Sequence, residues 1–504
     1  MMKNVLEYLE CSAEKYPDKI AVKDAESSCS YIKLLENAKH IGSALLEYQL
    51  PRKPVIVFMH KSVEALNAFM GIISAGCFYV FINPDQPEPR IKQILEITKA
   101  KYIITHNEFI DTIKKVEFSG KLLEYNKIIE TEINEEKLRN IRESALDIDP
   151  LYCNFTSGST GVPKGVLVSH RSVIDFMEYF PDMFQITHDD IIGNQAPFDF
   201  DVSVKDIYST LKVGATMVII PKQFFSVITK LLDYICDEKV TTMIWAVSAL
   251  CLITQLRGLT YKIPTSVNKI LFSGEVMPIK HLKLWREALP KANFVNLYGP
   301  TEITCNCTYY RVDRDFEPNE ILPIGKAFPN EKVFLISENN EEITEKEKIG
   351  EICVSGTAVA LGYYNNEAQT SKAFVQNPLN TEYMEIIYRT GDLAVYNNDG
   401  DLCFAGRKDF QIKYMGHRIE LEEIEATLNG YPDIDRACCI FDSDKNKIIA
   451  FYVGSMEKKE IQKKMRESLP IHMIPKTFYS MEELPMTQNG KIDRKKLRDY
   501  GRLK

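Results

Sequence analysis

The sequence lacks the long apolar run that a membrane-spanning helix requires. No stretch approaches the ~20 consecutive apolar residues of a span, and residues 1–7 carry an acid where a signal peptide would be apolar. Basic charge is also scarce, since 62 Lys and Arg residues against 70 Asp and Glu residues give a net charge of −8. A negative chain is a poor partner for nucleic acid or for an anionic membrane. We therefore expect a cytoplasmic protein with no nucleic-acid partner and no membrane insertion.

The 12 cysteines lack the spacing of a metal site. Cys305 and Cys307 stand two positions apart and Cys438 is followed directly by Cys439, and neither spacing suits a tetrahedral zinc site. Scattered thiols in a long intracellular chain are mostly small buried apolar residues. The sequence therefore predicts no disulfide and no structural metal.

Strands and helices alternate through the first three fifths of the chain. A chain of 504 residues is too long for one core, so two or more domains are expected. Apolar strands are expected at 20–22, 55–59 and 102–105, with helices over 38–46 and 63–75. Such alternation favours a parallel sheet covered on both faces. Further strands are expected at 166–168, 216–220, 242–245, 269–272 and 294–298, with helices from 170 and over 227–236.

The pattern changes twice in the last part of the chain. From Lys332 short strands follow one another, with a hairpin turn within 395–404. After residue 406 a small α+β pattern begins. Its helices are expected over 420–428 and 459–469 and its strands over 437–441 and 448–453. The predicted fold is α/β, with a large N-terminal body of helix-covered mixed or parallel sheets and a small β-rich unit (1–406), plus a small mobile α+β C-terminal domain (407–504).

The segment 156–165, Thr-Ser-Gly-Ser-Thr-Gly-Val-Pro-Lys-Gly, is the strongest local signal. Glycines allow a tight turn and a close approach to a ligand, and successive N–H groups with nearby hydroxyls suit phosphate oxygens. A hydrolytic P-loop would need Gly and Ser or Thr where Pro163 and Gly165 stand, so that interpretation fails. Taken alone, the segment is also compatible with an ordinary Gly/Ser loop.

Seven further segments contain chemically informative residues, one before this loop and six after it. They are Asn83-Pro84, Phe200-Asp201-Val202-Ser203, Asn296-Leu297-Tyr298-Gly299-Pro300-Thr301-Glu302, Gly350 to Gly356, Tyr388-Arg389-Thr390-Gly391-Asp392-Leu393, Gly406 to Glu425, and Asn489-Gly490-Lys491-Ile492-Asp493-Arg494. With the loop, they resemble the adenylate-forming superfamily of acyl-CoA synthetases, nonribosomal peptide synthetase adenylation domains and luciferases. The resemblance covers essentially the whole chain.

The resemblance implies ATP and Mg²⁺ as cofactors. A carboxylate attacking the α-phosphate of ATP needs charge neutralisation and alignment. Glu302 is the implied Mg²⁺ ligand, because Mg²⁺ prefers oxygen ligands, and Lys491, Glu302 and Arg407 are the implied catalytic residues. The implied ATP-binding residues are Thr156, Ser157, Gly158, Ser159, Thr160, Lys164, Asn296, Tyr298, Thr301, Asp392, Arg407 and Lys491.

Individual roles follow from the chemistry of these side chains. Asn296 can pair with the adenine edge and Tyr298 can stack on the ring, while Asp392 suits the ribose hydroxyls and Arg407 adds a fixed positive fork. Considered singly, Tyr298 could equally be a packed core aromatic and Asp392 a turn residue before a strand. Their order in the motif set favours the functional interpretation.

Lys491 would pass for a solvated surface lysine on composition alone. The resemblance implies instead that it enters the site during adenylation and bridges the substrate carboxylate and the α-phosphate. Asp409 matches the family hinge, about which the small domain would rotate after adenylation. Lys491 would then leave, and the face around Gly416 would meet the incoming thiol.

The substrate positions resemble those of amino-acid-activating members. Asp201 matches the acid that pairs with the substrate's α-ammonium, a partner that a buried carboxylate needs. Segments 202–208 and 274–278 resemble the D-alanine:D-alanyl carrier protein ligases. The implied substrate-binding residues are Asp201, Val202, Lys205, Ile244, Leu271, Ser273, Leu297, Cys305 and Asn306.

Two residues depart from that subgroup. Ser273 replaces a cysteine that shapes the chiral pocket, and Lys205 stands at a pocket-lining position that is otherwise apolar. Lys205 could pair with a side-chain carboxylate of a glutamate-like or aspartate-like substrate. Alternatively, its stem could run along the wall and its ammonium reach solvent or a neighbouring acid. The surrounding motif favours the second arrangement and thus D-alanine or another small neutral amino acid.

The thiol acceptor is expected to be a separate protein. The chain ends ten residues after Arg494 without a carrier segment, so a phosphopantetheinylated carrier protein is the leading partner and coenzyme A the second. An acyl- or aryl-CoA synthetase of the same fold is the alternative function, against which Asp201 argues. A non-catalytic scaffold is the third, against which Glu302, Asp392, Arg407 and Lys491 argue.

Overall fold

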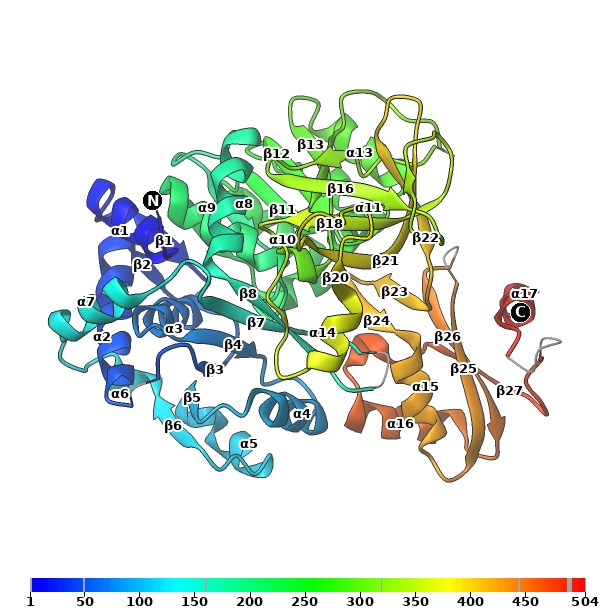
Figure 1. The fold of residues 1–504 in the computed structure, drawn as a ribbon, viewed down its shortest axis with the longest axis horizontal. Coiled ribbons are helices and arrows are strands. Elements are labelled where there is room, and N and C mark those ends of the chain that lie inside the picture. The colour runs from blue at the N-terminus through cyan, green and yellow to red at the C-terminus, as the bar shows by residue number, and fades with distance from the viewer. Residues whose placement is uncertain are drawn as a thin grey trace.

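A computed structural model describes residues 2–48, 50–158, 161–318, 320–442, 445–486 and 492–503. Two large sheets form the body, and both are mainly parallel with antiparallel edge strands (Figure 1). This arrangement confirms the predicted helix-covered α/β body. No helix within the described ranges is long and apolar enough to cross a membrane.

The first sheet carries the predicted phosphate loop between two of its strands. Strands β3 and β4 at its centre are buried along their whole length, as their continuous apolar runs predict for a parallel sheet covered on both faces. The order is β19-β8-β7-β4-β3-β5-β6. The bounds are β3 (Pro54–Phe58), β4 (Phe78–Ile82), β5 (Tyr102–Thr105), β6 (Lys121–Glu124), β7 (Pro150–Thr156), β8 (Lys164–Ser169) and β19 (Gly362–Tyr363). The helices of this part are α2 (Tyr31–Leu46), α3 (Val63–Ser74), α4 (Glu88–Thr98), α5 (Ile110–Lys115), α6 (Tyr125–Ile128) and α7 (Glu135–Ser144), with the 3-10 turn η1 (Asn107–Phe109).

The second sheet supplies most of the predicted substrate wall. Its order is β15-β14-β13-β12-β11-β9-β10-β1-β2. The bounds are β1 (Ile20–Lys23), β2 (Ser28–Ser30), β9 (Ile191–Asn194), β10 (Thr216–Ile219), β11 (Thr242–Ala246), β12 (Lys269–Ser273), β13 (Asn293–Tyr298), β14 (Thr308–Arg311) and β15 (Lys326–Ala327). Its helices are α1 (Leu6–Lys15), α8 (His170–Met183), α9 (Val202–Val213), α10 (Ile228–Asp237), α11 (Val247–Gln255), α12 (Gly258–Tyr261) and α13 (Ile279–Ala288), with η2 (Lys222–Ser226) and η3 (Thr301–Ile303).

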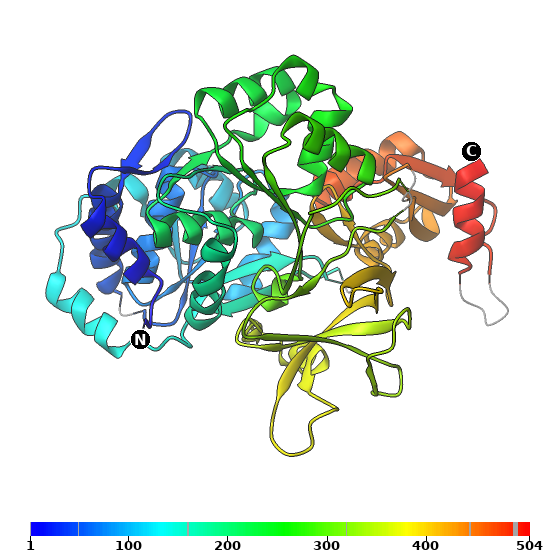
Figure 2. The same ribbon diagram turned by 90° about the horizontal axis from the view of Figure 1, so that it is seen from above.

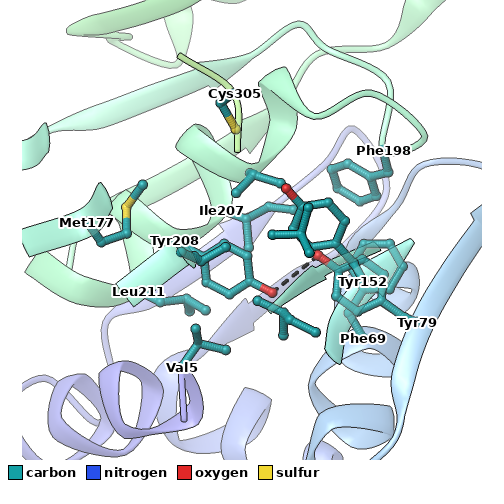
Figure 3. Packing of buried hydrophobic residues seen from close by; sticks show 14 of the residues in the cluster. Val5, Phe69, Tyr79, Tyr152, Met177, Phe198, Ile207, Tyr208, Leu211 and Cys305 are labelled. Atoms are coloured by element: carbon teal, nitrogen blue, oxygen red, sulfur yellow. Dashed lines mark hydrogen bonds between the residues drawn. The ribbon is translucent and has the colours of Figure 1, made fainter. Parts of the chain in front are cut away.

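Helix α9 joins the two sheets through the core. Tyr208 of α9 packs beside Tyr79 of β4 and Tyr152 of β7, and the hydroxyls of Tyr79 and Tyr208 are 3.2 Å apart (Figure 3). The helix ends at Gly214, whose φ of +76° favours glycine. A Cβ there would also approach the Tyr16 ring to 2.5 Å. Packing on both sides therefore fixes α9, which begins beside Asp201.

The β-rich unit and the small domain follow as predicted. A third, antiparallel sheet contains β16 (Glu331–Ile336), β17 (Glu342–Ile343), β18 (Gly350–Gly356), β20 (Phe374–Gln376), β21 (Ile386–Tyr396) and β22 (Leu402–Arg407), beside α14 (Glu367–Ala373). The remainder forms the small α+β domain, drawn orange to red beyond the body (Figure 2). It contains the hairpin β23 (Gln411–Tyr414) and β24 (His417–Glu420), the strands β25 (Ile434–Asp442), β26 (Lys447–Gly454) and β27 (Thr477–Ser480), the turn η4 (Ile471–Met473), and the helices α15 (Leu421–Asn429), α16 (Lys458–Ser468) and α17 (Arg494–Leu503).

Candidate active site

Three of the predicted nucleotide residues form one connected cluster. Tyr298 ends β13 and donates from its hydroxyl to Asp392 Oδ2 at 2.5 Å. Arg407 lies opposite Asp392 in the β21–β22 pair and makes an ion pair with its other oxygen. Asp392 lies inside β21 and is 1% exposed, so the alternative of a turn residue before a strand does not hold. Burial alone would lower the pKa of Arg407, but the hydrogen bond to Asp409 and the charge of Asp392 raise it.

Asn296 lies two residues before Tyr298 on the same strand. Its Nδ2 donates to the carbonyl oxygen of Pro323 at 2.8 Å, and the residue is buried. This contact fixes the plane of the amide beside the Tyr298 cluster.

The phosphate loop joins the end of β7 to the start of β8. Thr156 and Lys164 face each other across the strand pair, while Ser159 and Thr160 lie outside the described residues. A Cβ at Gly158 would lie 2.0 Å from the carbonyl oxygen of Val162, so the turn requires glycine. Within the described part of the chain, the Thr156 hydroxyl is buried and has no hydrogen-bond partner. A buried unpaired hydroxyl is costly, and a phosphate oxygen would satisfy it.

Glu302 lies in η3, directly after the Tyr298 strand, and is 0% exposed. Its carboxylate accepts hydrogen bonds from Arg418 Nη1 at 2.7 and 2.9 Å and from the Tyr363 hydroxyl at 2.7 Å. Burial alone would raise the pKa of Glu302, but the Arg418 charge and the Tyr363 hydrogen bond lower it. An ionised carboxylate beside the phosphate loop has the donor chemistry that Mg²⁺ requires.

The small domain places three charged side chains on this region. Besides Arg418, Glu423 accepts a hydrogen bond from the backbone N–H of Gly158 at 3.3 Å, and Glu420 lies 3.9 Å from Lys164 Nζ. These carboxylates contact the same loop groups that the sequence assigns to phosphate. In this orientation of the small domain, the carboxylates of Glu420 and Glu423 thus lie against the phosphate loop, near Lys164 and the Gly158 N–H.

The β23–β24 hairpin enters the site between these contacts. Its turn residue Gly416 donates its N–H to Glu275 Oε1 at 2.5 Å, and Lys413 Nζ lies 5.2 Å from the centre of the Tyr298 ring. The helix α17 packs on β25, on the side of the small domain away from the body (Figure 1). The Gly416 face is therefore the one turned toward the site. Lys491 lies outside the described residues.

The predicted substrate wall comes together around the start of α9. Ile244 and Leu271 are partners on neighbouring strands, and both are buried, as are Leu297, Cys305 and Asn306. Val202 opens α9 and is partly exposed. Thr304 and Cys305 are consecutive residues with positive φ, a conformation that is uncommon for non-glycine residues.

Asp201 ends the turn that precedes α9, and its backbone carbonyl accepts a hydrogen bond from Cys305 Sγ at 3.0 Å. Burial raises the pKa of Asp201, against the lowering effects of Lys205 and of the Thr301 side chain. The predicted ammonium acceptor thus lies against the segment that follows Glu302.

The environment of Lys205 differs from the expectation that its ammonium reaches solvent or a neighbouring acid. Its side chain is 0% exposed, so the ammonium does not reach solvent. Among the residues that the structure describes, no carboxylate oxygen lies within 4.0 Å of its Nζ. The ammonium instead donates to Asn306 Oδ1 at 2.6 Å and to Ser273 Oγ at 3.5 Å. The stem does not run outward, because α9 is packed on both sides.

Two family models match the chain along its length. The model for the AMP-binding enzyme matches residues 9–364, and that for the AMP-binding enzyme C-terminal domain matches residues 423–491. The chain is a member of the AMP-binding enzyme family. Both parts of this family are present, in the order in which the large body and the small domain follow one another.

Relatives of this AMP-binding enzyme include peptide synthases. Zwittermicin A synthase ZmaJ from Bacillus cereus is 32% identical, over 95% of this chain and 92% of the relative. Tyrocidine synthase 1 from Brevibacillus parabrevis is 30% identical over 98% of this chain, which spans only 45% of that relative. The solved structure of holo-PA1221, an NRPS protein containing adenylation and PCP domains, has a TM-score of 0.83 at 24% identity, covering 98% of this chain and 84% of that one. That likeness shows the fold.

Three charged residues that lie at the site of this AMP-binding enzyme were not predicted from the sequence. Arg418, Glu423 and Glu275 all belong to quoted motifs, but none was given a role. Their contacts run between the body and the small domain, across at least 116 positions. The available signal was the high content of charged residues in segment 417–425, and it does not say which surface the domain faces.

Proposed function

We propose that this AMP-binding enzyme activates an amino acid as an aminoacyl-adenylate and transfers it to the phosphopantetheine thiol of a separate carrier protein. The observation that carries this proposal is the hydrogen bond from Cys305 Sγ to the backbone carbonyl of Asp201 at 3.0 Å. It joins the predicted ammonium acceptor to the segment that follows Tyr298 and Glu302. A substrate ammonium at Asp201 would place its carboxylate beside the nucleotide residues.

The adenylation half uses the positive and polar groups of the loop and strand ends. Lys164 and the buried Thr156 hydroxyl bind phosphate oxygens, Asp392 accepts the ribose hydroxyls, and Arg407 holds Asp392 in place through their ion pair. Glu302 would hold Mg²⁺, which supplies neutralisation of phosphate charge when bound. Lys491 enters with the small domain to orient the reacting carboxylate, and Asp409 is the hinge of that movement.

The thiol-transfer half-reaction uses the orientation in which the Gly416 face of the small domain is turned toward the site. The hairpin turn then borders the path by which a thiol would reach the adenylate, and a carrier protein is the proposed donor of that thiol. The PCP domain beside the adenylation domain in the holo-PA1221 structure supports this partner. The motif resemblance implies D-alanine or another small amino acid as substrate, and the chemistry of the wall is considered below.

ATP–pyrophosphate exchange with a panel of D- and L-amino acids tests the proposal. We expect exchange with at least one amino acid, and formation of a thioester when a phosphopantetheinylated carrier protein is added. Exchange with simple carboxylic acids but with no amino acid would contradict it and favour an acyl-CoA synthetase.

A further inference from the structure

Lys205 is a buried lysine with no carboxylate partner among the residues that the structure describes. It is among the largest fully buried side chains, at 0% exposure. Its Nζ contacts are two neutral oxygens, Asn306 Oδ1 at 2.6 Å and Ser273 Oγ at 3.5 Å. Burying a charged group without an opposite charge is costly, so such groups are normally paired.

The two acids nearest in sequence do not form an ion pair with Lys205. Asp206 Oδ2 accepts a hydrogen bond from Asn194 Nδ2 at 2.6 Å, and Asn194 Oδ1 in turn accepts one from Lys61 at 2.9 Å. The other oxygen of Asp206 is buried and has no hydrogen-bond partner among the described residues. Asp201 lies one helical turn before Lys205, so both side chains lie on the same side of α9. Asp201 and Lys205 thus present opposite charges about one turn apart.

The wall opposite Lys205 is polar and has space beside it. Ser273 ends β12, and a Cβ built on the next residue, Gly274 (φ +95°), would meet no atom within 4 Å. Asn306 follows the strained residue Cys305. The ammonium is therefore held by an amide and a hydroxyl, and the residue that follows Ser273 borders open space.

We propose that Lys205 binds a carboxylate on the side chain of the substrate, so that this enzyme activates an acidic amino acid of the aspartate or glutamate type. The inference rests on the proposed function, because it takes Asp201 as the partner of the α-ammonium. The substrate then has an α-ammonium that pairs with Asp201 and a side-chain carboxylate that pairs with Lys205. Asn306 and Ser273 fix the direction of the Lys205 ammonium and complete its hydrogen bonds.

The alternative is a neutral lysine amine in a pocket for a small substrate. Desolvation lowers the pKa of Lys205, which favours the neutral form when no carboxylate is bound. A neutral amine would accept as well as donate hydrogen bonds and would give no preference for a carboxylate over its amide. The two arrangements therefore differ in how the enzyme ranks aspartate against asparagine and glutamate against glutamine.

The experiment compares exchange with aspartate, glutamate, asparagine, glutamine, alanine and serine in both chiralities. A charge-assisted hydrogen bond to Lys205 predicts that an acid exceeds its own amide and alanine by about 10- to 100-fold in kcat/KM. The Lys205→Met variant keeps the apolar stem and should lose this preference. Lys212→Met, on the same helix but bonded to the Met177 carbonyl, is the matched control and should keep it.

The outcomes separate the inference from the proposed function. An acid ranked first in the wild type and demoted in Lys205→Met supports the inference. Alanine or another neutral amino acid ranked first in both proteins overturns it and leaves amino-acid activation standing, whereas no exchange with any amino acid in the wild type overturns both. Protection against thermal unfolding by ATP, measured for wild type and Lys205→Met, shows that the variant still folds. If Lys205→Met does not fold, the wild-type preference for acid over amide decides the question.

Discussion

Arg418 Nη1 lies 2.7 Å from Glu302 Oε2 and 2.9 Å from Oε1, so a side chain of the small domain closes on the carboxylate assigned to Mg²⁺. Glu302 is fully buried, and Arg418 contacts both of its oxygens. Arg418 and a metal ion therefore compete for the same group. Metal binding should favour the departure of this part of the small domain from the site.

Replacing Arg418 by Gln should lower the Mg²⁺ concentration needed for half-maximal ATP–pyrophosphate exchange. The substitution leaves Glu302 buried without its cation, which costs about 3–5 kcal/mol in this orientation and shifts the population away from it. Thioester formation from a supplied adenylate should slow for the same reason. Arg286→Gln, which removes a pair with the exposed Asp315, is the control. An unchanged Mg²⁺ requirement would contradict the competition.

Replacing Asp201 by Ala should abolish most amino-acid activation. The substrate ammonium would lose its partner, at about 3–5 kcal/mol for a broken buried pair, which is more than a hundredfold in kcat/KM. ATP binding should change little. Exchange kinetics and ATP titration measure the two effects, with the exposed Asp189→Ala as control. Full activity of Asp201→Ala with amino acids would contradict the role of Asp201 as the partner of the substrate's α-ammonium.

The sequence predicted the fold well because its strongest signals are local. The short runs at 55–59 and 242–245, which are apolar apart from Thr242, favour buried strands, and they are β3 and β11. The order of the motifs likewise led to the prediction of Tyr298, Asp392 and Glu302 as site residues, since each belongs to a short segment with a distinctive sequence. Tyr298 and Asp392 come from different sheets and are joined by a hydrogen bond at 2.5 Å, which the separate motifs do not reveal.

Contacts that depend on distant segments could not be predicted. The environment of Lys205 is set by Asn306 and Ser273, which are 101 and 68 residues away and reach it through a turn with positive φ. A lysine stem is as compatible with an outward path as with a buried one, and only the packing of α9 decides. Arg418 shows the same limit, because its partner depends on how the small domain is turned.

The buried pair of Asp190 and Lys269 should make stability depend on pH. Lys269 Nζ lies 2.8 Å from Asp190 Oδ1, and the side chains are 11% and 4% exposed. Burial alone would raise the pKa of Asp190, but the hydrogen bonds of Lys269 and Thr241 lower it below the ordinary value. A lowered carboxyl pKa stabilises the fold above the unfolded pKa of about 3.9, and the contribution is lost as pH falls through the folded pKa.

Lys269→Met should therefore lower the thermal midpoint at pH 5–8 by a constant amount, and the deficit should shrink below about pH 4. Breaking a buried pair costs about 3–5 kcal/mol, with the lower end expected because Thr241 and Thr242 still donate to Asp190. Thermal unfolding across this pH range measures it, with the exposed Lys291→Met as control. A deficit that grew on acidification would be inconsistent with a lowered pKa of Asp190.

Replacing Lys491 by Ala should separate the two half-reactions. The proposed role of Lys491 is confined to adenylation, when it orients the substrate carboxylate and offsets the charge developing at the α-phosphate. ATP–pyrophosphate exchange should fall to background. Transfer from a supplied aminoacyl-adenylate to a thiol should persist, because the orientation described here presents Gly416 to the site.

Both rates are measured on the same preparations, with the exposed Lys495→Ala as a control for charge at the C-terminal end. A second variant tests the opposite orientation. Glu275→Gln weakens the acceptor of the Gly416 N–H, so it should slow transfer more than exchange. Opposite effects of the two variants are expected only if the small domain presents different faces in the two half-reactions. Equal losses of both rates in Lys491→Ala would mean that one fixed orientation serves the whole reaction.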